Sequence, residues 1–167
     1  SERAELQERL AQAVETTERL PMYEQRVAEK LSELGALRDR EVDENHLAEL
    51  RSWLVAAARQ SGCQVRRIDF ASPASRPWKT DDHPIDLPAD GDKRGANTPF
   101  DLQTRPGAFS VTGTTSEVLA LLKSIDDDQR LKHTNTLDLK PTSRSSQELQ
   151  LELNLWYFAL VKSKGVA

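Results

Sequence analysis

The sequence predicts an α+β protein: an N-terminal coiled-coil helix followed by a two-layer sandwich with a four-stranded antiparallel sheet. Three observations predict this class. The first 40 residues carry an apolar repeat with coiled-coil spacing, two later segments are amphipathic helices, and several segments alternate between apolar and polar residues. The chain has 167 residues, which is enough for one domain plus an extended element. We expect a coiled-coil helix over residues 1–40 and the sandwich domain over residues 41–167.

The helix predicted over residues 2–39 has a strict 4-3 apolar spacing, typical of a left-handed coiled coil. Pro21 predicts a kink or break near residues 17–21, because proline removes a backbone donor and clashes one turn back. The stripe could pack on the chain's own domain or on another chain. Its polar positions and a length of about 57 Å favour another chain. The predicted interface positions, with Glu24 completing the repeat, are Leu6, Leu10, Ala13, Thr17, Leu20, Val27, Leu31 and Leu34.

A second helix is predicted from Glu44 to Gln60, with Asp43 as its N-cap and Gly62 at its end. The first strand follows over Cys63–Phe70. Its alternation is imperfect, and a bulge at Arg66–Arg67 would place its four apolar residues on one face. Those residues are Cys63, Val65, Ile68 and Phe70.

Residues 71–99 are predicted to be a long irregular loop that contains five prolines. A loop of this length is unusual in a small domain, so we expect it to be functional or mobile. It gathers His83 and several carboxylates, among them Asp81, Asp82, Asp86, Asp90 and Asp92. Their spacing does not match a calcium loop, so the sequence favours no metal site and no cofactor.

The next segment reads as a strand from Phe100 to Val111 with Arg105-Pro106-Gly107 inside it, either a small hairpin or one interrupted strand. Thr114 and Glu117 form a capping box that starts a helix. In the last two strands, Leu137 and Leu139 are predicted to face inward, and Leu149 to Tyr157 alternate with one wet face. The resulting order α-β-β-α-β-β is that of a permuted ferredoxin-like sandwich.

Composition and motifs disfavour several functions. The net charge is −4, and residues 61–167 are neutral with 14 acidic and 14 basic residues, so nucleic-acid binding is not expected. No nucleophile motif, phosphate loop or dinucleotide fingerprint is present, and we predict no enzyme. The single cysteine, Cys63, is expected to be a buried and unreactive thiol. Trp156 and Phe158 predict an apolar spot that is either a subunit contact or part of the core.

The run from Phe109 through Gly113 to Ile125 resembles the PilO family of type IV pilus assembly proteins, in which a strand reads into a glycine and then a helix. The strand Leu137–Pro141, a polar turn and the leucine-alternating strand Leu149–Phe158 also resemble that family. The GspM proteins of type II secretion share this layout.

The resemblance implies a non-enzymatic envelope component with one membrane span before residue 1, a coiled coil, and a ferredoxin-like domain on the periplasmic side of a bacterial inner membrane. It implies pairing with a second copy or with a PilN-like or GspL-like protein. The alternative from the residues alone is a small-ligand-binding or regulatory domain, with loop 71–99 as its lid.

Overall fold

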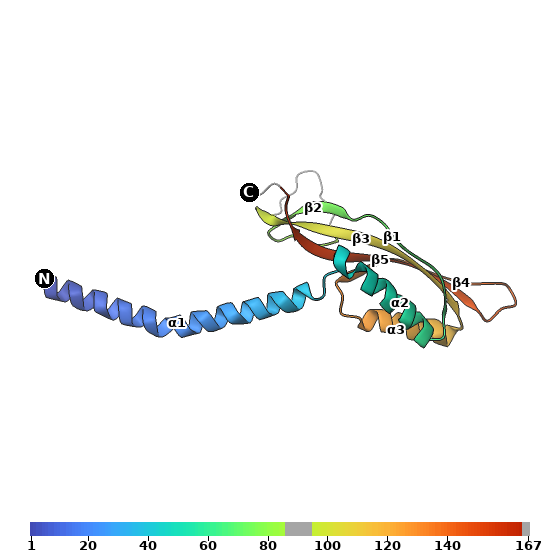
Figure 1. Cartoon of the computed structure of the whole chain (residues 1–167), viewed down its shortest axis with the longest axis horizontal. Coiled ribbons are helices and arrows are strands. Elements are labelled where there is room, and N and C mark those ends of the chain that lie inside the picture. Colours follow the sequence, from blue (N-terminus) through green and yellow to red (C-terminus); the bar gives the residue numbers. More distant parts are fainter. Residues whose placement is uncertain (86–94, 165–167) are drawn as a thin grey trace. The chain divides into compact units, whose positions relative to one another are not determined.

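The computed structural model describes residues 1–85 and 95–164 and divides the chain into two units, Ser1–Asp39 and Arg40–Ala167. The first unit is the single helix α1 (Glu2–Arg38). The second contains, in chain order, η1 (Glu44–His46), α2 (Leu47–Gln60), β1 (Gln64–Phe70), β2 (Ala74–Lys79), β3 (Asn97–Gly113), α3 (Thr115–Asp127), β4 (Lys132–Pro141) and β5 (Leu149–Lys162). The class is therefore α+β with a long N-terminal helix and an antiparallel sheet (Figure 1).

Helix α1 continues through Pro21 without a break, and Figure 1 shows it bending near its middle. Two causes lie in the same turns. Pro21 supplies no N–H to the preceding turn, and the hydroxyls of Thr16 and Thr17 donate to the carbonyls of Gln12 and Ala13 at 2.8 Å. Such back-bonding bends helices, as proline does. Of the two predicted outcomes, a kink or a break, the break does not occur.

The sheet has five strands, not the four predicted, in the order β1-β3-β5-β4 with β2 pairing β3 as well. Strands β1 and β2 lie one after the other along the same long strand: β1 pairs with the second half of β3 and β2 with the first half. Strand β2 lies within the segment predicted to be an irregular loop. Its sequence Ala-Ser-Arg-Pro-Trp-Lys does not alternate, and Pro77 is tolerated because β2 is an edge strand.

Strand β3 is one continuous element, so neither of the two predicted alternatives at Arg105-Pro106-Gly107, a hairpin or an interruption, is present. Arg105 is buried and holds this point of the strand, pairing with Glu44 and donating to the carbonyl of Ala71 at 3.1 Å. A Cβ atom on Gly107 would lie 2.9 Å from the ring of Phe70, so glycine allows that ring to pack across β3.

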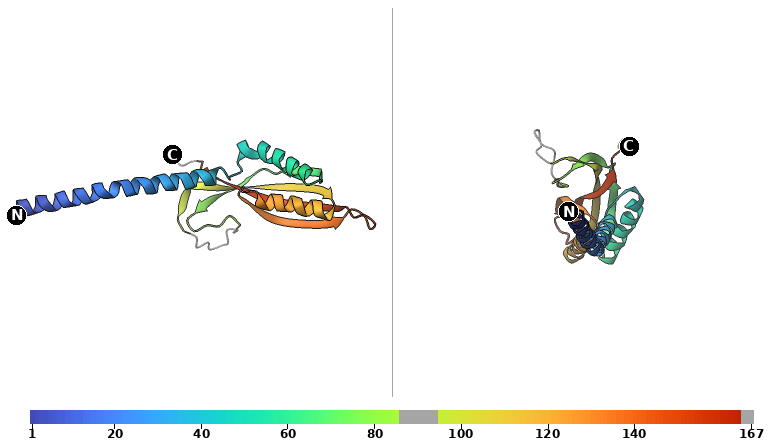
Figure 2. Two further views of the ribbon diagram at one scale, coloured as in Figure 1. Left: turned by 90° about the horizontal axis from the view of Figure 1, so that it is seen from below. Right: turned by 90° about the vertical axis from the view of Figure 1, so that its left-hand side faces the viewer.

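Helices α2 and α3 cover one face of the sheet, as Figures 1 and 2 show. Helix α2 packs on β1, and α3 packs on β3 and β5. The bulge predicted in β1 is present between Val65 and Arg67. It places Cys63, Val65, Ile68 and Phe70 against one core, as expected. The capping box of Thr114 and Glu117 is also confirmed.

The core lies between these helices and alternate residues of the two central strands. Its largest fully buried side chains are Tyr157, Leu50, Leu54, Leu121, Leu151, Leu155, Val111 and Val118. The opposite face is polar, as the alternation in β5 predicts. There Glu152 accepts from Ser110 at 2.9 Å, and Asn154 donates to Thr136 at 2.7 Å.

Candidate protein-interaction surfaces

The predicted coiled-coil positions form one exposed stripe on α1, which we call the α1 seam. No residue of α1 is buried. The larger apolar side chains of the seam are between 45% and 66% exposed. The seam consists of Leu6, Leu10, Ala13, Thr17, Leu20, Glu24, Val27, Leu31 and Leu34. Exposed apolar residues at this spacing can be covered by a second helix.

The polar flanks and one polar seam position of α1 fit a helix pair. Glu15 pairs with Arg19 on the side of the helix away from the seam, and Lys30, one residue before Leu31, pairs with Glu33 at 3.0 Å. The Thr17 hydroxyl already donates to its own helix, so covering it leaves no donor unsatisfied. Sequence reasoning missed four further exposed apolar residues of α1, which follow no 4-3 repeat: Val14, Met22, Tyr23 and Leu37.

Trp156 and Phe158 do not form the exposed spot that was one of the two predictions. Phe158 is only 6% exposed, which matches the core alternative. Trp156 is half-buried, and its ring lies 5.9 Å from that of His133 on β4. Strand β5 passes beside the chain that enters the domain, since the Val42 N–H donates to the Phe158 carbonyl at 3.1 Å. Phe158 therefore has no free face large enough for a partner.

Leu137 and Leu139 on β4 are not buried, contrary to prediction. They are 50% and 41% exposed. Their register opposite Leu153 and Leu151 places them on the helix-covered face, as expected. Since α3 packs on β3 and β5, the helical layer stops before β4. The alternation thus identified the correct face, and the limited width of the layer above it leaves both leucines exposed.

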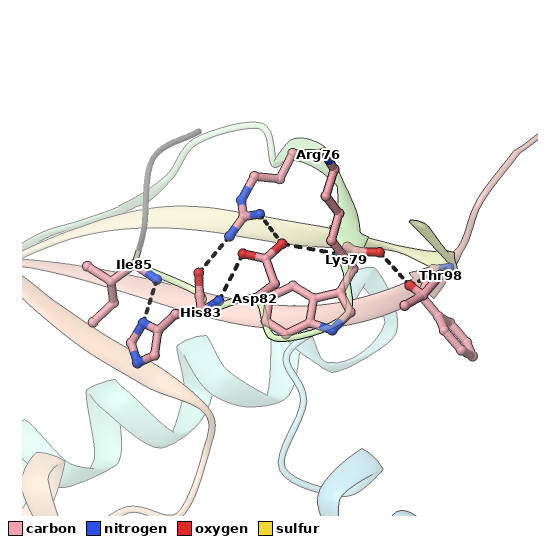
Figure 3. Close-up of polar contacts among 8 residues, drawn as sticks. Arg76, Lys79, Asp82, His83, Ile85 and Thr98 are labelled. Atoms are coloured by element: carbon pink, nitrogen blue, oxygen red, sulfur yellow. Dashed lines mark hydrogen bonds and ion pairs between the residues drawn. The ribbon is translucent and has the colours of Figure 1, made fainter. Parts of the chain in front are cut away.

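The segment after β2 is organised by Asp82, whose side chain is 1% exposed. Figure 3 shows its carboxylate bonded to the Arg76 guanidinium at 2.6 Å and to backbone N–H groups of Lys79 and His83 at 3.2 and 2.8 Å. Arg76 also donates to the His83 carbonyl at 2.7 Å. These contacts use the Asp82 carboxylate to fix a turn. Among the candidate metal ligands of the sequence, Asp86, Asp90 and Asp92 lie outside the described residues.

His46 and Cys63 both have structural surroundings that account for them. His46 lies 2.6 Å from the capping carboxylate of Asp43. Cys63 is 4% exposed, and its burial, with the nearby Glu117 charge, raises the pKa of the thiol. Within residues 1–85 and 95–164, no group of three histidine, cysteine or acidic side chains is placed to hold a metal ion.

One hollow of about 550 Å³ lies between α2 and the end of α3. Arg130 stacks over Trp53 at 5.2 Å on its border and pairs with Asp128 at 2.8 Å. Burial lowers the pKa of the nearby Lys132 ammonium, although Asp128 opposes that shift. The hollow is lined by Trp53, Ala56, Ala57, Gln60, Ser124, Asp127, Asp128 and Gln129. Ser124 supplies the one hydroxyl of this lining, and it donates to the Ala120 carbonyl of its own helix at 3.1 Å.

None of the helices in the described residues combines the length and the apolar character that crossing a bilayer requires.

Comparison with known proteins finds likeness in structure only. No family model and no curated protein matches the sequence. The crystal structure of the type 4 fimbrial biogenesis protein PilO from Pseudomonas aeruginosa matches with a TM-score of 0.54 at 14% identity, covering 85% of this chain and 89% of that one. The core region of the same protein gives 0.45 at 13% identity, covering 66% and 93%. A core domain from Akkermansia muciniphila gives 0.45 at 16% identity, covering 68% and 58%. The first of these likenesses shows that the chain has a PilO-like fold.

Proposed function

We propose that this chain is a non-enzymatic assembly component of a bacterial envelope machine of the type IV pilus or type II secretion kind. The observation that carries the proposal is the α1 seam, a mostly apolar stripe with coiled-coil spacing and no buried residue. The PilO-like fold supports it, because the likeness extends over most of both chains. In this function α1 pairs with a second helix, and a ferredoxin-like domain built on β1, β3, β5 and β4 binds neighbouring subunits.

The mechanism we propose is geometric, with no bond made or broken. Two α1 helices pack their seams together and hold two subunits in register. Each buried leucine contributes about 1.5 kcal/mol or more to that pairing. The partner is a second copy of this chain or a PilN-like or GspL-like protein. We place the domain on the periplasmic face of the inner membrane. Fusing the protein to a reporter enzyme that is active only outside the cytoplasm would test this location.

The experiment is a pair of charge substitutions in the seam. Leu10→Asp with Leu31→Asp would bury four carboxylates in a dimer, and we expect the mass by light scattering to fall from two chains to one. The dissociation constant should rise at least about a hundredfold, because loss of the buried leucines removes several kcal/mol of pairing free energy and each 1.4 kcal/mol changes the constant tenfold.

The matched control adds the same charges on the outer side of the same helix, with Ala11→Asp and Ser32→Asp. Both positions follow a seam residue by one and face solvent in a coiled coil. This control should keep the wild-type mass. A wild-type chain that is monomeric with α1 intact, or equal masses for the two variants, would contradict the pairing of two copies through the seam.

A further inference from the structure

Strand β4 is an edge strand with an unpaired backbone. It lies last in the sheet order and pairs only with β5 among the described strands. The Thr142 N–H donates to the Glu148 carbonyl at 3.0 Å, so the backbone groups of Thr142 point toward β5. Backbone direction alternates along an antiparallel strand. The N–H and C=O groups of Leu137 and Leu139 therefore point to the free edge.

Helix α3 carries further leucines that are not buried. Ser124 and Asp127 of α3 line the hollow shared with α2, so that side of α3 faces α2. Leu119 and Leu122 lie on the opposite flank by helical spacing, which is the flank toward β4 because α2 covers β1. Leu119 is 57% exposed, and Leu122 is half-buried. We call Leu119, Leu122, Leu137 and Leu139 the β4 strip.

We propose that the β4 strip and edge bind a second copy of this chain, with the two β4 strands paired antiparallel about a two-fold axis at Leu139. This inference rests on the proposed function and names the surface of the domain that performs it. In this register Leu139 lies opposite Leu139, and Leu137 lies opposite Pro141. The free carbonyl of Pro141 can accept a hydrogen bond from the Leu137 N–H of the second copy. Pro141 has no N–H to donate in return at this edge.

Charge complementarity selects this register. On the other face of β4, Asp138 and Lys140 already lie within 2.9 Å of each other and are well exposed. An axis at Leu139 places Asp138 opposite Lys140 of the second copy, twice in the dimer. An axis at Asp138 would place two like charges directly opposite each other, which destabilises a sheet. An axis at Leu137 would place Leu139 opposite Asn135, at the irregularity between Thr134 and Thr136.

Cysteine cross-linking of the full chain tests the register. Residues opposite each other in a bonded pair have Cα atoms about 5.5 Å apart, which a disulfide can bridge. We expect Leu139→Cys to form a disulfide-linked dimer on mild oxidation. Leu137→Cys should not, because its two copies would be four residues apart, about 13 Å along the strand. The wild type is the background control, since its only cysteine is buried. Equal cross-linking at both positions, or none at 139, overturns the proposal.

Charge reversal gives a second readout in the Leu139→Cys chain. Asp138→Lys should slow cross-linking about tenfold by opposing like charges, and adding Lys140→Asp should restore it. If the double reversal does not restore the rate, the proposed pairing is wrong. The seam is tested separately by the mass of the Leu10→Asp/Leu31→Asp chain. If Leu139→Cys does not cross-link but the seam substitutions still lower the mass, the strand pairing is rejected and the proposed function stands.

Discussion

At the scale of single residues, the Phe70 ring limits the size of the residue that position 107 of β3 can hold. The Phe70 ring lies across Gly107 of β3 and meets the Tyr157 ring edge-on, with centroids 6.3 Å apart. Arg51 covers the other side of Phe70 at 5.5 Å. Phe70 is therefore held from two sides and has little room to move away from a side chain added at position 107.

We expect Gly107→Ala to lower the free energy of unfolding by about 1–3 kcal/mol, the usual range for overpacking a core. The new Cβ would lie 2.9 Å from a ring atom that cannot move freely. Chemical denaturation measures the effect. Gly35→Ala is the control: no atom lies within 4 Å of its Cβ, and alanine favours a helix by about 1 kcal/mol. Unchanged stability in Gly107→Ala would mean that Phe70 is not confined.

Tyr157 is buried with a hydroxyl that has no hydrogen-bond partner, and burial raises its pKa. We expect Tyr157→Phe to raise the free energy of unfolding by about 1 kcal/mol at pH 7, because it removes an unsatisfied polar group. The folded state keeps the phenol proton that the unfolded state loses above about pH 10. Wild-type stability should therefore fall as pH rises past that point, and the variant should lack this part of the fall.

Denaturation curves at pH 7 and pH 10.5 measure both effects. Tyr23→Phe on α1 is the control, since that ring is 53% exposed. The raised pKa of the Cys63 thiol adds a fall that starts lower, near pH 9, and that remains in all three chains. A Tyr157→Phe chain with the alkaline profile of the wild type would contradict the assignment.

At the scale of elements, signals that depend on local chemistry were predictable. The Thr114 capping box and the bulge at Arg66 follow from a few adjacent residues, and both are present. Strand β2 was missed because it is held by pairing with β3 and not by its own pattern. Leu139 shows a third case: alternation gives its face, but burial depends on how far α3 extends over the sheet.

The positions of the α1 seam could be predicted from the sequence for the same reason as the capping box, since helical periodicity depends only on nearby residues. The exposed β4 edge was not, because strand order is set by contacts far apart in the sequence. Chain order places β4 before β5, yet only the register shows that its leucines lie beyond the helices. Phe158 likewise needed the Val42 contact, more than 100 residues away, to be recognised as buried.

Pro21 gives a prediction at the element scale. Replacing it with alanine restores a backbone donor to Thr17 and should stabilise α1 by up to about 3 kcal/mol per helix. The seam pair should then dissociate less and melt at a higher temperature, as followed by circular dichroism at 222 nm. Glu24→Ala tests a seam position without a backbone effect and serves as comparison. If Pro21→Ala weakens the pair, the bend itself is needed for the seams to meet.

At the scale of the whole molecule, the two units obtain their stability from different sources. Residues 40–167 have their own core, whereas α1 has no buried residue. A lone helix in water is marginal, because its nucleation is unfavourable and tertiary packing normally supplies its stability. We therefore expect α1 to gain stability when its seam is covered, and the chain to unfold in two steps.

The two steps can be separated by their signals. All three tryptophans, Trp53, Trp78 and Trp156, lie in the second unit, and α1 contains only Tyr23 among the aromatics. In the wild type, the loss of helix signal from α1 should shift to higher temperature as protein concentration rises, because pairing is bimolecular. The unfolding temperature followed by the tryptophan signal of the domain should rise with protein concentration only if β4 pairing stabilises the domain.

In the Leu10→Asp/Leu31→Asp chain we expect the far-ultraviolet helix signal to fall at low temperature by the share of the 37 residues of α1, while the near-ultraviolet tryptophan signal remains native. The Ala11→Asp/Ser32→Asp chain should keep both signals. A seam variant that retains its full helix signal as a monomer would show that α1 is stable without a partner. The same result would mean that wild-type pairing draws only on burial of the seam leucines and gains nothing from folding of the helix.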